Sequence, residues 1–139
     1  MTVLAVLEGF ATALAAPEIG AKDIEGLTEI TDSMGEALDG LDPLMFGRLN
    51  GEFHTAIYER CPNASLVDLL HDVARRLDAI RRTVFIQIPY RGAASIEEHR
   101  ELIALIAGGA PATDIERAAR EHKLHTVQSF REWRAEQGS

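Results

Sequence analysis

The segment Asp42-Pro43-Leu44-Met45-Phe46-Gly47-Arg48-Leu49-Asn50-Gly51-Glu52-Phe53-His54-Thr55-Ala56-Ile57-Tyr58 shows most clearly how this chain folds. Its large apolar residues recur at intervals of three and four, the spacing of an amphipathic helix. Asp42 is of a residue type that caps helix N-termini, and Pro43 suits the first helical position, where the missing N–H costs no hydrogen bond. We therefore predict a helix that begins at Pro43 and stops before Pro62.

The same helical spacing continues on both sides of this segment, and no stretch alternates like a strand. We predict further helices over residues 3–14, 24–38, 66–84, 95–107 and 113–133. Asn63 is a candidate cap for the third of these, and the last two open with capping boxes, Ser95 with Glu98 and Thr113 with Glu116. Because the connections are short and no repeat or linker is visible, we predict a single domain over residues 1–139. Its fold is an all-α antiparallel bundle of about six helices.

Charge and composition exclude several classes of protein. The net charge of −8 argues against a nucleic-acid surface, which needs clustered Lys and Arg. Cys61 is the only cysteine, so an intramolecular disulfide is impossible and a reducing compartment fits. No apolar run approaches the roughly 20 residues that span a bilayer, and the first residues lack the basic region of a signal peptide. We expect a cytoplasmic protein without membrane contact.

Asn50 and His54 stand four residues apart, so both project from one face of their helix. Other helices of a bundle can add His99 and His122 from inside. Imidazoles with one oxygen donor suit zinc, nickel or a similar divalent ion. The structural alternative stays open: His54 can be a core-edge histidine bonded to an amide, and His99 an exposed residue in the first turn of its helix. His71 is expected on an exposed face or at a helix contact.

Further candidates surround this possible metal site. His125 follows His122 by three residues, so either histidine, or both, can be a ligand. A small-molecule carboxylate could fill the open coordination positions, and Arg81, Arg82 or Arg91 could bind it through bidentate hydrogen bonds. The alternative for each arginine is a solvated helix face.

Motifs of the common enzyme classes do not occur in the sequence. There is no His-Glu-x-x-His helix, no Gly-x-Ser-x-Gly elbow and no phosphate-binding glycine loop. An open position on zinc can activate water, so a small metal-dependent hydrolase or isomerase is an alternative. Its general base would be Glu52 or Glu98, both of which we expect to point away from the ion. We predict a protein that is not an enzyme.

Five short motifs occur in order along the chain. They are Val6-Leu7-Glu8-Gly9-Phe10-Ala11-Thr12-Ala13-Leu14-Ala15-Ala16, Asn50-Gly51-Glu52-Phe53-His54, Pro62-Asn63-Ala64-Ser65-Leu66, Glu98-His99-Arg100 and Ala118-Ala119-Arg120-Glu121-His122. Together they resemble the C-terminal effector-binding domain of GntR-type transcription regulators of the FadR subfamily, the FCD domain, over essentially the whole chain. The resemblance implies an all-helical antiparallel bundle that binds a divalent metal, with a small organic acid at or near it. Carried over by motif, the metal ligands are Asn50, His54, His99 and His122.

The chain departs from the family pattern in ways that matter for function. Asn50 replaces the commoner Asp, and a neutral amide oxygen should bind metal more weakly. The loop at residues 108–113 looks longer than usual, which leaves the choice between His122 and His125 open. Family members carry a winged helix-turn-helix domain and usually form dimers. We expect a homodimer that contacts DNA only through such a domain, which this sequence lacks.

A plain helical dimerisation module is the remaining alternative. It predicts a dry, apolar bundle centre without a histidine cluster. His54, His99 and His122 would then lie more than about 10 Å apart, too far for zinc–nitrogen bonds.

Overall fold

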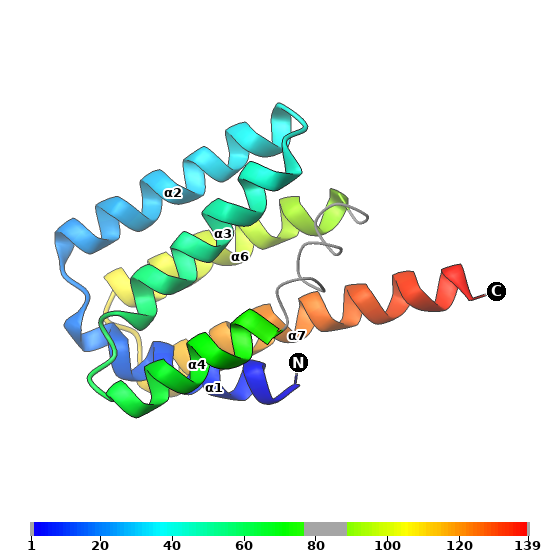
Figure 1. The fold of residues 1–139 in the computed structure, drawn as a ribbon. Helices are drawn as coiled ribbons and strands as arrows, with labels where there is room; N and C mark the ends of the chain where they lie inside the picture. The colour runs from blue at the N-terminus through cyan, green and yellow to red at the C-terminus, as the bar shows by residue number, and fades with distance from the viewer. Residues whose placement is uncertain (1, 77–88, 139) are drawn as a thin grey trace.

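The computed structural model describes residues 2–76 and 89–138, and every regular element in these ranges is a helix (Figure 1). The elements are α1 (Thr2–Ala15), the 3₁₀ helix η1 (Ala16–Glu18), α2 (Ala21–Asp39), α3 (Pro43–Tyr58), α4 (Ala64–Arg76), α6 (Pro89–Ala107) and α7 (Ala112–Gln137). The predicted all-α bundle of about six helices is confirmed. None of the described helices is both long enough and apolar enough to cross a membrane.

The helices form two groups that meet in the middle of the molecule (Figure 1). In one group α2 packs on α3 and α6, and in the other α1 packs on α7 and α4. Contacts of α6 with α7, and of α1 with α3, join the groups. The main apolar core draws on both and includes Leu4, Phe53, Leu70 and Leu102. Helices α3, α6 and α7 therefore all face a shared interior.

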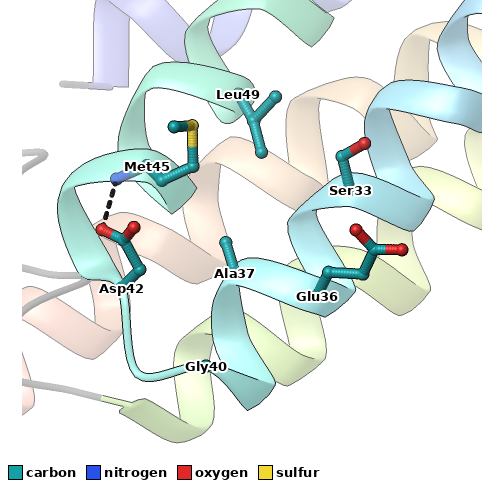
Figure 2. Close-up of a pocket in the computed structure, with 7 residues that line it drawn as sticks. All are labelled: Ser33, Glu36, Ala37, Gly40, Asp42, Met45 and Leu49. Atoms are coloured by element: carbon teal, nitrogen blue, oxygen red, sulfur yellow. Dashed lines mark hydrogen bonds between the residues drawn. The ribbon is translucent and has the colours of Figure 1, made fainter.

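Two predicted helix caps are present. The Asp42 carboxylate accepts a hydrogen bond from the backbone N–H of Met45 at 3.1 Å, drawn as a dashed line in Figure 2, and Pro43 occupies the first turn of α3. The Asn63 side chain accepts from the N–H of Leu66 at 3.0 Å at the start of α4. Each cap satisfies a backbone donor that has no partner within its helix.

Both predicted capping boxes are wrong. Helix α6 begins at Pro89, so Ser95 lies well inside it and is fully buried. Helix α7 begins at Ala112 with Pro111 as its N-cap, and Glu116 forms an ion pair with Arg120 instead of reaching back to the helix start. A Ser/Thr-x-x-Glu sequence also fits a helix interior, where its Glu can bind other partners: Glu98 contacts histidines of α7, and Glu116 pairs with Arg120 one turn later.

The helix predicted over residues 66–84 can be compared with the structure only in part. Its described portion ends at Arg76, and the predicted continuation to residue 84 lies outside the described residues. Arg81 and Arg82 also lie outside them.

Helices α1 and α7 approach each other closely at Gly9. A Cβ atom on Gly9 would lie 2.9 Å from the backbone oxygen of Glu116 and 3.1 Å from Cβ of Arg120. On the neighbouring position, the buried Glu8 carboxylate pairs with Nζ of Lys123 at 3.2 Å and accepts a hydrogen bond from the Tyr58 hydroxyl. Both a steric fit and a buried ion pair thus hold α1 in register on α7.

This close contact predicts opposite effects of two glycine substitutions. Gly9→Ala should lower the free energy of unfolding by about 1–3 kcal/mol, because a methyl group there overpacks the α1–α7 contact. Gly26→Ala in α2 is the matched control: apart from the adjoining residues and backbone of its own helix, no atom lies within 4 Å of its Cβ position, and removing a helical glycine should raise stability by about 0.5–1 kcal/mol. Urea unfolding of both variants measures the difference. Stabilisation by Gly9→Ala would contradict the packing.

Candidate metal centre

Three histidines from three helices meet in the interior of the bundle. His54 comes from α3, His99 from α6 and His122 from α7, and all three are buried. Each offers a ring nitrogen, and these nitrogens lie within 4.8 Å of one another. The ring centroids are 5.2 Å apart for His54 and His99, 5.3 Å for His54 and His122, and 4.8 Å for His99 and His122. The three imidazoles therefore surround one point, as ligands of a single ion do.

Packing in the core sets the orientation of these rings. His99 stacks on Phe53 with centroids 3.8 Å apart and planes 3° apart, while Phe53 meets the neighbouring ring of His54 edge-on. Phe53 is itself fully buried. Phe53 of α3 thus holds the ring of His99 from α6 close to the ring of His54, its neighbour on α3.

Several buried polar atoms, on the cluster itself or one helical turn from it along α3 and α6, have no hydrogen-bond partner among the described residues. They include Oδ1 of buried Asn50, both ring nitrogens of His99 and Oγ of Ser95. Buried polar atoms are nearly always paired, so atoms of this kind indicate a place where a ligand or ion can bind. Imidazole nitrogens and an amide oxygen are donors that zinc and nickel accept. The residues present therefore fit a divalent metal.

The electrostatic surroundings favour the neutral, metal-binding form of the imidazoles. Burial lowers the pKa of His99 well below its ordinary value of 6.5, and the positive charges of Lys123 and Arg91, like that of His122 when it is protonated, act in the same direction. Burial also lowers the pKa of His122, although its hydrogen bond to Glu98 opposes the shift. Both rings are neutral near pH 7 and keep a lone pair for a ligand.

Glu98 occupies a position that the sequence did not predict. Its Oε1 lies 2.7 Å from Nδ1 of His122, its Oε2 lies 2.6 Å from Nδ1 of His125, and both oxygens accept hydrogen bonds from Arg91. Burial disfavours the charge of this carboxylate, but the hydrogen bonds with His122 and Arg91 outweigh it and lower its pKa to about 2. We expected Glu98 to point away from the ion; its carboxylate contacts two of the histidines at Nδ1, and it is not part of the group of described residues that could share one ion.

The predicted ligand-binding residues fall into different places. Arg91 is 3% exposed; its Nε donates to Oγ1 of Thr126 at 3.2 Å, and its Nη2 donates to the backbone oxygen of His122 at 3.1 Å. His125 lies outside the cluster with 56% of its side chain exposed. His71, as expected, sits at a helix contact, where its ring meets Tyr58.

The sequence also contained a signal for Ser95 that we missed. Arg91, Ser95 and His99 follow one another at intervals of four, so they line one face of α6. The spacing of this polar row matches that of Asn50 and His54 on α3. The predicted helix start at Ser95 and Glu98 hid this row, because it placed Arg91 outside the helix.

A separate surface pocket of about 450 Å³ lies at the corner between α2 and α3 (Figure 2). Its lining residues are Ser33, Glu36, Ala37, Gly40, Asp42, Met45 and Leu49. No member of the histidine cluster lines it, so the pocket and the cluster are different sites.

Comparisons with known proteins concern the fold and the family of this chain. Among solved structures, the fold is similar to E. coli McbR/YncC, with a TM-score of 0.77 and 20% sequence identity over 99% of this chain. The present chain spans 63% of the length of that protein. A search of curated proteins found no match. The FCD domain family matches residues 1–125. The chain therefore belongs to the FCD domain family, the ligand-sensing regulatory domains of GntR-type transcription regulators.

Proposed function

We propose that this domain binds one divalent metal ion through Asn50, His54, His99 and His122, and that a small organic acid binds beside the metal as its effector. The observation that carries the proposal is the convergence of three buried imidazole nitrogens within 4.8 Å, together with buried polar atoms on the same helices that have no partner among the described residues. The plain dimerisation module required these histidines to lie far apart, and it does not account for the cluster.

Zinc or nickel suits this donor set best, since three imidazoles and one oxygen are borderline-soft ligands. When bound, the ion would supply a Lewis-acidic centre with open positions for a carboxylate. Asn50 would be the weakest donor, because its amide oxygen carries no full charge. Phe53, stacked on His99, would keep that imidazole in place whether or not metal is bound.

Two side chains near the cluster support an organic acid as the effector. The guanidinium of Arg91 is buried and its Nη2 lies 3.4 Å from Nδ1 of His122; because it also pairs with Glu98, an acid at the site would share this cation with that carboxylate. Ser95, between Arg91 and His99 on α6, has a buried hydroxyl that can donate to an oxygen of the acid. Arg81, Arg82 and His125 remain further candidates for this contact.

The domain would act as the sensor of a transcription regulator and not as an enzyme. Binding of the acid would shift a homodimer between two arrangements, and a winged helix-turn-helix domain in the parent protein would contact DNA. The ligand can shift that equilibrium only by the difference of its affinities for the two states. For the hydrolase alternative, Glu98 is poorly suited as a general base, because a pKa of about 2 is far from neutral pH.

Removing one imidazole should abolish stoichiometric metal binding. We expect the wild type to bind one zinc ion and His99→Ala to lose it, measured by elemental analysis after dialysis. His71→Ala is the control, since His71 contacts Tyr58 and lies outside the cluster. Equal zinc content in all three proteins would rule out the metal role of His99.

Replacing the weak amide donor should strengthen the site. Asn50→Asp introduces a carboxylate of nearly the same shape, and we expect zinc affinity to rise about tenfold, or about 1.4 kcal/mol. Without metal the same variant should melt at a lower temperature than the wild type, because a buried charge is then uncompensated. Competition with a chromophoric chelator gives the affinity, and an unchanged or weaker value would remove Asn50 from the ligand set.

The effector proposal predicts that carboxylates bind only after metal. Acetate and succinate should raise the melting temperature of the zinc-loaded protein and leave the zinc-free protein unchanged, because ligand binding to the folded state stabilises it by mass action. Acetamide and succinamide serve as uncharged controls. A shift of equal size without zinc would show that the acid does not need the metal.

A further inference from the structure

We propose that Glu98 is the positioning residue of the metal centre: it holds Nδ1 of His122, leaves Nε2 of that ring for the metal, and keeps His125 outside the coordination sphere. This inference rests on the proposed metal site. It concerns a residue that is not itself a ligand.

The carboxylate determines which nitrogen of His122 carries the hydrogen. An ionised carboxylate only accepts hydrogen bonds, so at the 2.7 Å contact Nδ1 of His122 is the donor. Arg91 Nη2, at 3.4 Å from the same Nδ1, is also a donor and cannot take that proton. A neutral imidazole has one N–H, and Nε2 of His122 therefore keeps its lone pair. Ligating histidines in metal sites are commonly fixed in this way by a carboxylate.

Glu98 can orient His122 because it is fixed itself. Both of its oxygens accept hydrogen bonds from the guanidinium of Arg91, which stands seven residues earlier on α6. Arg91 is anchored in turn on α7, through Oγ1 of Thr126 and the backbone oxygen of His122. The carboxylate thus belongs to a closed network between α6 and α7, in which little freedom remains for the ring of His122.

The same carboxylate distinguishes His122 from His125, between which the sequence left the choice of metal ligand open. Oε1 faces Nδ1 of buried His122, and Oε2 faces Nδ1 of His125, which is mostly exposed. A direct hydrogen bond to Glu98 ties His125 to the outer side of the network. His122 is then the member of the pair that joins His54 and His99.

The matched pair Glu98→Gln and Glu97→Gln tests this role. Both remove one carboxylate from the same turn of α6, but Glu97 is 69% exposed and pairs only with exposed Arg100 among the described residues. We expect Glu98→Gln to weaken zinc binding by about 10- to 100-fold, the usual effect of losing a partner that orients a ligand. Glu97→Gln should bind zinc as the wild type does. His125→Ala should also bind zinc as the wild type does.

The visible absorption of bound Co²⁺ separates positioning from simple stabilisation. At saturating Co²⁺, Glu98→Gln should shift the absorption bands because His122 is no longer held in one orientation, whereas a merely structural loss leaves the spectrum of the loaded protein unchanged. If circular dichroism shows that Glu98→Gln is unfolded, Glu98→Asp replaces it. Its carboxylate is one methylene shorter and cannot reach both histidines, so the same shift is expected.

Three results would overturn the inference. Wild-type zinc affinity together with a wild-type Co²⁺ spectrum in the Glu98 variant would remove its positioning role while leaving the metal site intact. Loss of zinc in His125→Ala would place that histidine among the ligands. Failure of the wild-type protein to bind zinc or Co²⁺ would overturn the proposed function, and this inference with it.

Discussion

The structure depends on keeping polar side chains buried where α3, α6 and α7 meet. Leaving a buried polar atom without a partner costs about 1–3 kcal/mol, and Asn50, Ser95 and His99 all contribute atoms that have no partner among residues 2–76 and 89–138. The surrounding apolar contacts must offset this cost before any ligand binds. A bound ion would satisfy several of these atoms at once, so the proposed ligand would also remove a source of instability from the core.

The rest of the bundle is built to hold this interior together. Gly9 lets α1 lie close on α7, and the ion pair of Glu8 with Lys123 fixes the same contact from inside. Lys123 follows His122 directly, while Tyr58, which bonds to Glu8, lies one turn after His54. The α1–α7 contact is thus continuous with the histidine cluster. A movement of α7 relative to α6 would therefore change the histidine cluster together with the position of α1. A sensor domain needs such coupling between its binding site and its other helices.

Much of this arrangement could be read from local sequence. The intervals of three and four in the apolar residues predicted the helices, and Asp42 and Asn63 predicted the starts of two of them. The start of α6 could not be read in this way, because Ser95 and Glu98 fit a capping box as well as they fit a helix interior. The choice between a helix start and a helix interior depends on the partners of Glu98 on α7. These partners, His122 and His125, are 24 and 27 residues away in the chain.

The sequence by itself determined the all-helical fold, the pairing of Asn50 with His54 on one helix face and the family to which the chain belongs. These properties depend on periodicity and short motifs, which are local. Only the tertiary structure decided that His122 joins His54 and His99 while His125 stays outside, and that Arg91 and Glu98 stand beside them. The physical reason is that two histidines three residues apart are equivalent in helical spacing. Their difference arises from tertiary packing: the ring of His122 lies buried against His54 of α3 and His99 of α6, whereas His125 is mostly exposed.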